Sequence, residues 1–383
     1  MRGLIVSLIV IQLTAGVCAA EDSKNPWLVS LSANYGSWRT GDLDSDGSQA
    51  MGFFQMSYDS GSWGAALTGA YVNTSYKASF SDDRFTIDTF TDTDISTYYS
   101  YKRKALTVQG GVDIGLPTGE PSYSDEDLSR IIVDDVSQDL MLINTYGAGL
   151  DIIPHIVLVY KFGRFTGGLG ARYEFTGEYD PTKDTPDDNF DPGDRLLGVL
   201  NGVLTVSKKD YLLLTLSYSY YGKDKQGGEE VYRQGDTVSV DGRYIRQWDS
   251  ALNTVLGVSY LTQAKNEILG DGGSLESERA NSNNNSLEVY LNTIYRYSGK
   301  LSLTGLVGYK QVGANGYSED DDYYDAGRSK AYVEPGIAWY FSSRMYATLK
   351  ARYSSVKDKK DASSAKDASY DVLNVDAGVV YSF

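Results

Sequence analysis

Three aspartates near the start of the chain have the spacing with which a calcium-binding loop begins. Asp42, Asp44 and Asp46 precede Gly47 in the pattern D-x-D-x-D-G, and carboxylates on alternate residues of a tight turn can point at one hard cation. A complete loop has a glutamate six residues after the glycine, where this chain has Phe53. The sequence therefore favours a plain acidic hairpin loop, with a calcium site as the alternative, and it indicates no other cofactor.

The residue types that serve as general base or thiol nucleophile are scarce. His155 is the only histidine and Cys18 the only cysteine. Asp151 lies four residues before His155 in DIIPHIVLVY, a separation of roughly 13 Å if the segment is a strand. A catalytic histidine needs a directly bonded partner to orient it. We therefore expect that the protein is not an enzyme.

The first twenty residues have the pattern of a secretory signal. Met1 and Arg2 precede the apolar run LIVSLIVIQL, which ends in small residues before Glu21. The run is too short to span a bilayer as a helix. We expect residues 1–20 to be cleaved and residues 21–383 to form one domain without cysteine, and hence without disulfides. Cleavage removes one positive charge, so the formal charge of −16 becomes −17, which argues against nucleic acid as a partner.

The remaining chain alternates apolar and polar residues in segments of about ten residues. The composition includes 40 Gly and 32 Tyr but only 8 Pro, and no later segment has the ~18 consecutive apolar residues of a membrane-spanning helix. Apolar residues occupy every second position in, among others, 27–35, 63–71, 106–114, 165–173, 212–220, 287–295 and 345–353, with aromatic residues near the segment ends. This period of two predicts an all-β protein.

The connections between these segments alternate between very short and long. Asp59–Ser62 and Gly163–Arg164 are short, whereas Pro117–Leu140 and Thr176–Asp194 are long. The pattern predicts a transmembrane, antiparallel, up-and-down β-barrel of about 16 strands, or of 14 as the alternative, with short periplasmic turns and long external loops. A soluble sandwich or propeller would explain neither the aromatic segment ends nor the two loop lengths.

The chain ends in YDVLNVDAGVVYSF, an alternating segment that stops on an aromatic residue. In a closed barrel this last strand would pair with the first one. Tyr381 and Phe383 resemble the terminal signal of bacterial outer-membrane β-barrel proteins, which the barrel-assembly machinery recognises. The resemblance implies export, location in the bacterial outer membrane, and outer-membrane lipid, lipopolysaccharide and the assembly machinery as partners.

A shorter motif resembles one transporter family. In VDIGLPTGE, Val112 to Glu120, a predicted strand ends at Pro117-Thr118-Gly119. This corner is similar to the strand-to-loop corner of the outer-membrane transporter family linked to phenol-degradation pathways. The resemblance implies the passage of aromatic or apolar compounds, but Pro-Thr-Gly is also ordinary turn chemistry, and no functional residue follows from it.

Charged side chains on the predicted inward face indicate a lumen that holds water or ion pairs, because an unpaired charge facing lipid costs several kcal/mol. The inward parity assigns to this lumen Arg172, Glu174, Asp241, Arg243, Glu288, Arg296, Lys310, Lys350 and Arg352. Other inward positions are apolar, namely Ile153, Val157, Val159, Val199, Val203, Leu213, Val255, Leu261 and Leu306. These form either a path for an apolar solute or a seat for an inserted plug, for which the segment Pro117–Leu140 is the candidate.

The sequence thus favours an outer-membrane channel, or porin, through which small solutes diffuse passively, with aromatic or apolar compounds among the candidate solutes. The alternative is a barrel without transport, whose long loops serve a structural or surface-recognition role. The lumen width separates the two, because a barrel of sixteen strands holds water unless it is plugged.

The predicted external loops carry most of the negative charge, which predicts a preference for cations. Their formal charges total −21, against −17 for the whole mature chain, over 39–49, 81–90, 117–141, 176–194, 222–235, 264–283, 314–329 and 357–369. Reversal potentials under a salt gradient should show cation selectivity that fades as the screening length falls below about 8–10 Å. Anion selectivity would mean that the lumen charges Arg172, Arg243, Arg296, Lys350 and Arg352 outweigh the loops.

Overall fold

A computed structural model of the chain describes residues 26–40, 45–77, 84–120, 122, 147–183, 189–359 and 367–383. The predicted signal peptide, Asp42 and Asp44 lie outside these residues, as does most of the proposed plug Pro117–Leu140. The signal, the calcium site and the plug therefore stay predictions. Within the described residues, no helix is long and apolar enough to cross a membrane.

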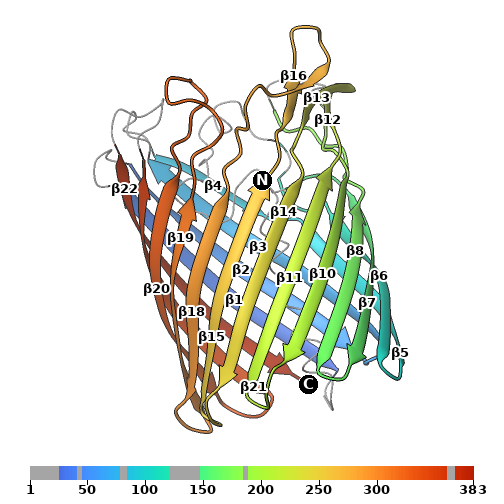
Figure 1. Cartoon of the computed structure of the whole chain (residues 1–383), viewed down its shortest axis with the longest axis vertical. Coiled ribbons are helices and arrows are strands. Elements are labelled where there is room, and N and C mark those ends of the chain that lie inside the picture. Colours follow the sequence, from blue (N-terminus) through green and yellow to red (C-terminus); the bar gives the residue numbers. More distant parts are fainter. Residues whose placement is uncertain are drawn as a thin grey trace.

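One antiparallel sheet forms the wall of the molecule, with long loops at one end and short turns at the other (Figure 1). The sheet has 17 strands, of which β4 and β5 both pair with β3 in succession and so form one wall strand of sixteen. The strands are β1 (Trp27–Thr40), β2 (Asp46–Asp59), β3 (Trp63–Lys77), β4 (Arg84–Phe90), β5 (Thr93–Arg103), β6 (Leu106–Leu116), β7 (Asp151–Phe162), β8 (Phe165–Glu174), β10 (Arg195–Thr205), β11 (Asp210–Tyr221), β14 (Thr237–Gln247), β15 (Leu252–Gln263), β18 (Ser286–Arg296), β19 (Leu301–Val312), β20 (Arg328–Tyr340), β21 (Met345–Asp358) and β22 (Ala368–Ser382). The predicted sixteen-stranded, up-and-down barrel is confirmed.

The last strand closes the barrel by pairing with the first. The register between β1 and β22 runs from Leu28 opposite Ser382 to Thr40 opposite Tyr370. Beyond it, the backbone amides of Trp27 and Phe383 each donate to the other residue's carbonyl oxygen, at 3.3 and 3.0 Å. The two rings stack with their centroids 6.3 Å apart. Closure therefore satisfies the backbone of both terminal strands, as a barrel in lipid requires.

The period of two places large apolar side chains on the outside of the wall. Leu169 is 53% exposed and Leu214 56% exposed, although an exposed leucine face would be unfavourable in water. Aromatic side chains border this surface near both ends, such as Phe162 and Tyr99 beside the short turns and Tyr353 towards the long loops. An apolar band between two aromatic girdles is the outer surface of a barrel that spans a bilayer.

The wall has a bulge between β4 and β5. Tyr71 pairs with Phe90 and Thr68 with Asp94, so two residues of β3 face three residues across the ladder. This β-bulge carries Asp92, whose carboxylate accepts hydrogen bonds from the backbone amides of Gly119 (3.1 Å) and Ala148 (2.9 Å). Asp92 therefore ties the two described ends of the β6–β7 connection to the bulge.

The Pro117-Thr118-Gly119 corner has a structural reason of its own. The Thr118 hydroxyl donates to the carbonyl oxygen of Thr91 at 3.1 Å. A Cβ atom on Gly119 would lie 2.7 Å from the Gly147 nitrogen and 2.8 Å from the Phe90 carbonyl oxygen, so a larger residue would displace the backbone. The corner that resembles a transporter family thus serves here to hold the start of the loop.

A second, five-stranded sheet stands above the wall at the long-loop end, where Figure 1 labels β12, β13 and β16. Three different loops contribute its strands, which are β9 (Phe190–Asp191), β12 (Asp224–Gln226), β13 (Glu229–Arg233), β16 (Glu267–Leu269) and β17 (Leu275–Ser277). Arg233 links the sheet to the wall region through ion pairs with Glu267 (2.9 Å) and Asp236 (2.8 Å). Burial and the nearby carboxylates Glu278 and Asp224 raise the pKa of Tyr232 in β13 to about 12.

Five inward rings lie over glycines that are directly opposite them on neighbouring strands. The pairs are Trp38 and Gly47, Tyr98 and Gly64, His155 and Gly111, Tyr290 and Gly257, and Tyr332 and Gly308. A Cβ atom built on any of these glycines would collide with the ring. The glycines therefore let the rings lie flat against the wall instead of projecting into the lumen.

Deletion of Phe383 tests the closure. It removes the stacking on Trp27 and both terminal backbone hydrogen bonds, so we expect less heat-modifiable barrel in the outer membrane. The test compares the exported chain with and without its last residue. Unchanged assembly would contradict a role for the terminal residue.

Replacement of Gly308 by alanine tests the contact between ring and glycine. The added methyl group would displace the Tyr332 ring, whose hydroxyl donates to Glu288 Oε1 at 2.7 Å, and we expect a loss of about 1–3 kcal/mol in the free energy of unfolding. Urea titration followed by gel mobility would measure it. Gly305→Ala on the same strand is the control, since its Cβ would meet nothing within 4 Å. Equal stability of the two variants would contradict the proposed contact between the Tyr332 ring and Gly308.

Candidate functional site

The inward face of the wall is the candidate site, because it bounds the lumen. Inward residues alternate with the exposed apolar residues of each strand. On β8, for example, Phe165, Leu169 and Tyr173 are exposed, whereas Arg172 and Glu174 are buried. All nine charged residues predicted for the lumen have the inward parity, and their exposure ranges from buried for Arg172 and Glu174 to exposed for Arg296 at the short-turn end. Their functional role stays a prediction.

Arg172 and Glu174 belong to a buried ion cluster near the long-loop end. Glu174 Oε2 lies 2.8 Å from Arg195 Nη2 on β10 and 3.6 Å from Arg172 Nη2. Each of the three side chains is at most 8% exposed. Sequence reasoning missed Arg195, although its inward parity with Leu197 and Val199 could have identified it. Glu174 therefore lies between two buried guanidinium groups, and its removal would take an opposite charge away from both.

A second cluster joins β18, β20 and β21. Glu334 Oε2 lies 2.6 Å from Arg352 Nη2, and Glu334 Oε1 lies 3.7 Å from Lys350 Nζ. The Arg352 guanidinium also lies 5.2 Å from the centroid of the Tyr332 ring, within cation–π range. The Tyr332 hydroxyl also donates a hydrogen bond to Glu288. The cluster therefore links three of the predicted lumen residues, Glu288, Lys350 and Arg352. Glu334, its central carboxylate, was not predicted.

The remaining predicted charges are placed on β14 and β19. Arg243 Nε lies 2.7 Å from Asp241 Oδ1 on the same face of β14. Lys310 on β19 is directly opposite Glu288 on one side and Lys330 on the other. The ion pairs between predicted lumen residues, Arg172 with Glu174 and Arg243 with Asp241, join opposite charges, as expected where water is restricted.

His155 faces the lumen, but its carboxylate partner is not the one nearest in sequence. Its Nδ1 atom lies 3.4 Å from Asp113 Oδ2 on β6, whereas Asp151 Oδ1 accepts a hydrogen bond from the Gly177 amide at 3.0 Å. The Ser96 hydroxyl in turn donates a hydrogen bond to the Asp113 carboxylate. The hydroxyl thus contacts the carboxylate and not the imidazole, which differs from the serine–histidine contact of a hydrolase.

The residues of the predicted calcium site lie mostly outside the described part of the chain. Among the described residues, no three side chains of His, Cys, Asp or Glu are placed to hold a metal ion. Asp46 is the first residue of β2, but Asp42 and Asp44 lie outside the described residues. The calcium site therefore stays a prediction.

The apolar inward residues form a band on β7, β10, β11, β15 and β19, which we call the apolar arc. Its members are Ile153, Val157, Val159, Val199, Val203, Leu213, Val255, Leu261 and Leu306. Ile153 and Val199 are buried, but Leu261 is 39% exposed although it points inward. Val157 and Val159 are opposite Gly170 and Gly168 on β8, which have no side chain to cover them. The lumen therefore presents accessible apolar surface.

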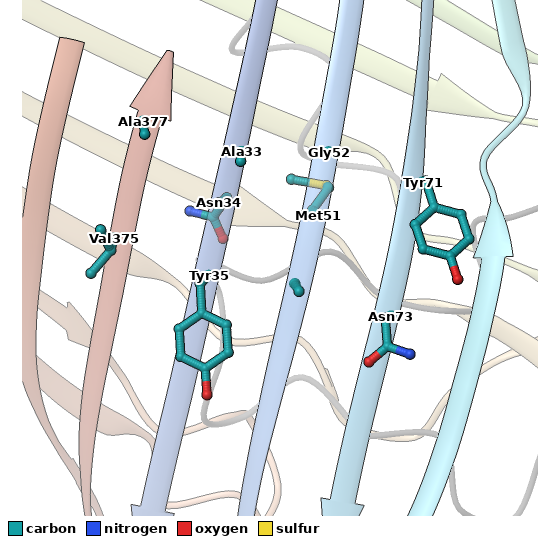
Figure 2. A pocket seen from close by; sticks show the side chains of 10 residues that line it. Ala33, Asn34, Tyr35, Met51, Gly52, Tyr71, Asn73, Val375 and Ala377 are labelled. Atoms are coloured by element: carbon teal, nitrogen blue, oxygen red, sulfur yellow. The ribbon is translucent and has the colours of Figure 1, made fainter.

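A hollow of about 410 Å³ lies on the outer surface and not in this lumen. Figure 2 shows it between β22, β1, β2 and β3, with Tyr35 and Tyr71 beside small residues such as Ala33 and Gly52. These residues have the outward parity of Leu31 and Phe54. The hollow therefore opens towards the surface that faces lipid and is not part of a path through the barrel.

Comparison with known proteins adds structural neighbours only. No family of known proteins and no curated sequence matches the chain. The CymD monoaromatic hydrocarbon channel is similar in structure, with 10% identity and a TM-score of 0.47 over 94% of this chain and 89% of the other. The Ralstonia pickettii toluene transporter TbuX has 10% identity and a TM-score of 0.45 over 94% and 90%.

A bacterial polysaccharide outer membrane secretin has a similar degree of likeness, with 7% identity and a TM-score of 0.48 over 94% of this chain and 100% of the other. These likenesses concern the fold alone.

Proposed function

We propose that the protein is an outer-membrane channel through which small solutes diffuse passively, including aromatic or apolar compounds. The observation that carries this proposal is the accessible apolar arc inside a sixteen-stranded barrel. A lumen for ions or sugars needs no apolar surface, whereas a packed barrel interior would bury a side chain such as Leu261, which is 39% exposed. An apolar solute that contacts the apolar arc removes apolar surface from water, which favours its entry into the lumen.

The location and partners belong to the same proposal. The apolar band and aromatic girdles fit a bilayer, and the signal-like residues 1–20 would direct export, which together suggest the bacterial outer membrane. Lipid and lipopolysaccharide would contact the outer face, and the barrel-assembly machinery would recognise Tyr381 and Phe383. We propose neither a cofactor nor a nucleic-acid partner.

A second candidate is a barrel that does not transport but recognises other molecules at the cell surface. The five-stranded outer sheet favours this candidate, because three loops combine to build it and ion pairs such as Lys225 with Asp191 (3.2 Å) stabilise it. Conductance in planar bilayers separates the two candidates. Stepwise currents support a channel, and their absence supports a barrel without transport.

Charge placed on the apolar arc tests the proposed path. Val157→Asp and Val255→Asp put a carboxylate where an apolar solute would make contact, and desolvating it costs several kcal/mol. We expect uptake of a small aromatic compound to fall roughly tenfold, equivalent to about 1.4 kcal/mol, while the conductance of a small ion changes little. Ser32→Asp is the matched control, because Ser32 is exposed on the inward face of β1, away from the apolar arc.

Other outcomes have distinct meanings. Raised conductance in the two valine variants would mean that the apolar arc seats a plug, which the new charge dislodges. No change in either flux would contradict the inward orientation of these residues, since a one-residue shift of register reverses every side chain.

A further inference from the structure

Three neighbouring turns at the short-turn end of the barrel, the lower end in Figure 1, are rich in basic residues. They are the β5–β6, β7–β8 and β10–β11 turns, which follow one another along the ladder. Their exposed basic residues outside the lumen are Arg103, Lys104, Arg164 and Lys208, which we call the basic rim. Lys102 and Lys161 have the inward parity of their strands and border the lumen instead.

The charges of the basic rim have no counter-charge in the protein. Within the described part of the chain, none of the four side chains makes an ion pair or a hydrogen bond. Asp210 is the only carboxylate in or beside the three turns. It accepts a hydrogen bond from the Tyr244 hydroxyl (2.6 Å) and lies 3.5 Å from Arg246, so it is engaged elsewhere. The neighbouring Lys209 donates to the Trp248 carbonyl oxygen at 2.7 Å and is not part of the rim.

The turns that carry the basic rim are close enough to act together. Consecutive turns at one end of an antiparallel barrel are two strands apart, which corresponds to roughly 10 Å. This distance is close to the screening length of about 8–10 Å at physiological salt. The positive potentials of the three turns therefore overlap, and the rim as a whole attracts an extended anionic surface.

Exposed aromatic side chains place the basic rim at the level of lipid headgroups. Phe162 (73% exposed) and Phe165 (46% exposed) directly flank the Gly163–Arg164 turn. Tyr101 (52% exposed) precedes Arg103 by two residues on the outward face of β5. Such rings lie at the membrane interface, and long basic side chains beyond them can reach the headgroup phosphates.

The backbone of Lys104 adds an observation of another kind. Its φ of 52° is the only positive φ of a non-glycine residue among those that the structure describes. A hairpin turn usually has glycine, asparagine or aspartate at such a position. The β5–β6 turn therefore carries a positive charge where the backbone favours a residue without one.

The opposite end of the barrel has the opposite charge. The predicted external loops total −21, so an anionic headgroup would be repelled there by the long-range field. Any preference for anionic lipid therefore belongs to the short-turn end.

We propose that the basic rim binds the phosphate groups of anionic phospholipids, so that the barrel prefers anionic to zwitterionic lipid at its short-turn end. The rim cations supply the attraction, and the exposed rings beside them hold the turns at headgroup depth. This interaction lies on the outside of the barrel and goes beyond the proposed transport, because it requires no flux through the lumen.

Electron spin resonance on the full mature chain in phosphatidylcholine bilayers tests the proposal. The probes are spin-labelled phosphatidylglycerol, which is anionic, and phosphatidylethanolamine with the same label, which is zwitterionic. The spectra give the fraction of each probe whose motion the protein restricts, and the ratio of the two fractions is the lipid preference. Both leaflets have the same composition, so the direction of insertion does not matter.

Two triple variants remove the same number of positive charges. The rim variant combines Arg103→Gln, Lys104→Asn and Arg164→Gln, and asparagine at position 104 suits the positive φ. The control variant combines Lys223→Gln, Lys225→Gln and Lys359→Gln at the long-loop end. Heat-modifiable mobility on gels confirms that each variant is folded.

Each basic residue near an anionic surface strengthens the attraction roughly fivefold. Because the rim occupies only part of the circumference, we expect a lipid preference of about twofold for phosphatidylglycerol when averaged over all lipid around the barrel. The rim variant should bring the ratio close to one, and the control variant should leave it unchanged. Salt of about 1 M, where the screening length is about 3 Å, should abolish the preference of the unmodified chain.

Three results would overturn the inference. They are equal restriction of both probes by the unmodified chain, equal loss of preference in the rim and control variants, and displacement of labelled phosphatidylglycerol by glycerol 3-phosphate in the water, which would indicate a phosphate site and not a lipid surface. None of them bears on transport, which conductance measures separately. Absence of any restricted lipid would overturn the inference together with the proposed membrane location.

Discussion

The pairing of β22 with β1 is the constraint on which the rest of the structure depends. In a bilayer, each backbone amide or carbonyl without a hydrogen-bond partner costs several kcal/mol, so a sheet there has to close. Closure with antiparallel neighbours requires an even number of strands and brings Trp27 and Phe383 together at the short-turn end. It also constrains the register of the ladder, and with it which residues lie opposite one another.

Charged side chains on the inward face lie where little water is available to solvate them. Most of its charges meet this condition in pairs across strands, such as Arg195 with Glu174 and Arg352 with Glu334. Rings such as Tyr290 and Tyr332 lie flat over glycines, so large side chains occupy the wall without filling the lumen. The residues that stabilise the barrel therefore leave the apolar arc accessible, as the proposed channel requires.

The long-loop end combines rigidity with negative charge. The bulge at Thr91 and Asp92 secures both described ends of the β6–β7 connection, and the outer sheet joins three further loops into one unit. These contacts hold backbone at the rim, where loops would otherwise be mobile. A channel and a recognition surface make different use of such a rim, since one needs it to stay open and the other needs it to present a fixed shape.

The sequence by itself determined the barrel and the side of the wall for Arg172, Val157 and the other inward residues, and it gave about sixteen strands with fourteen as the alternative. It could do so because a strand repeats every two residues, which makes orientation a local property of the chain. Which residues meet was decided only by the tertiary structure. Arg195 beside Glu174, Asp113 beside His155, and Lys310 opposite Lys330 are separated in sequence and brought together by register. Register depends on loop lengths, the bulge and closure of the whole ladder, and none of these can be derived from the alternation within one strand.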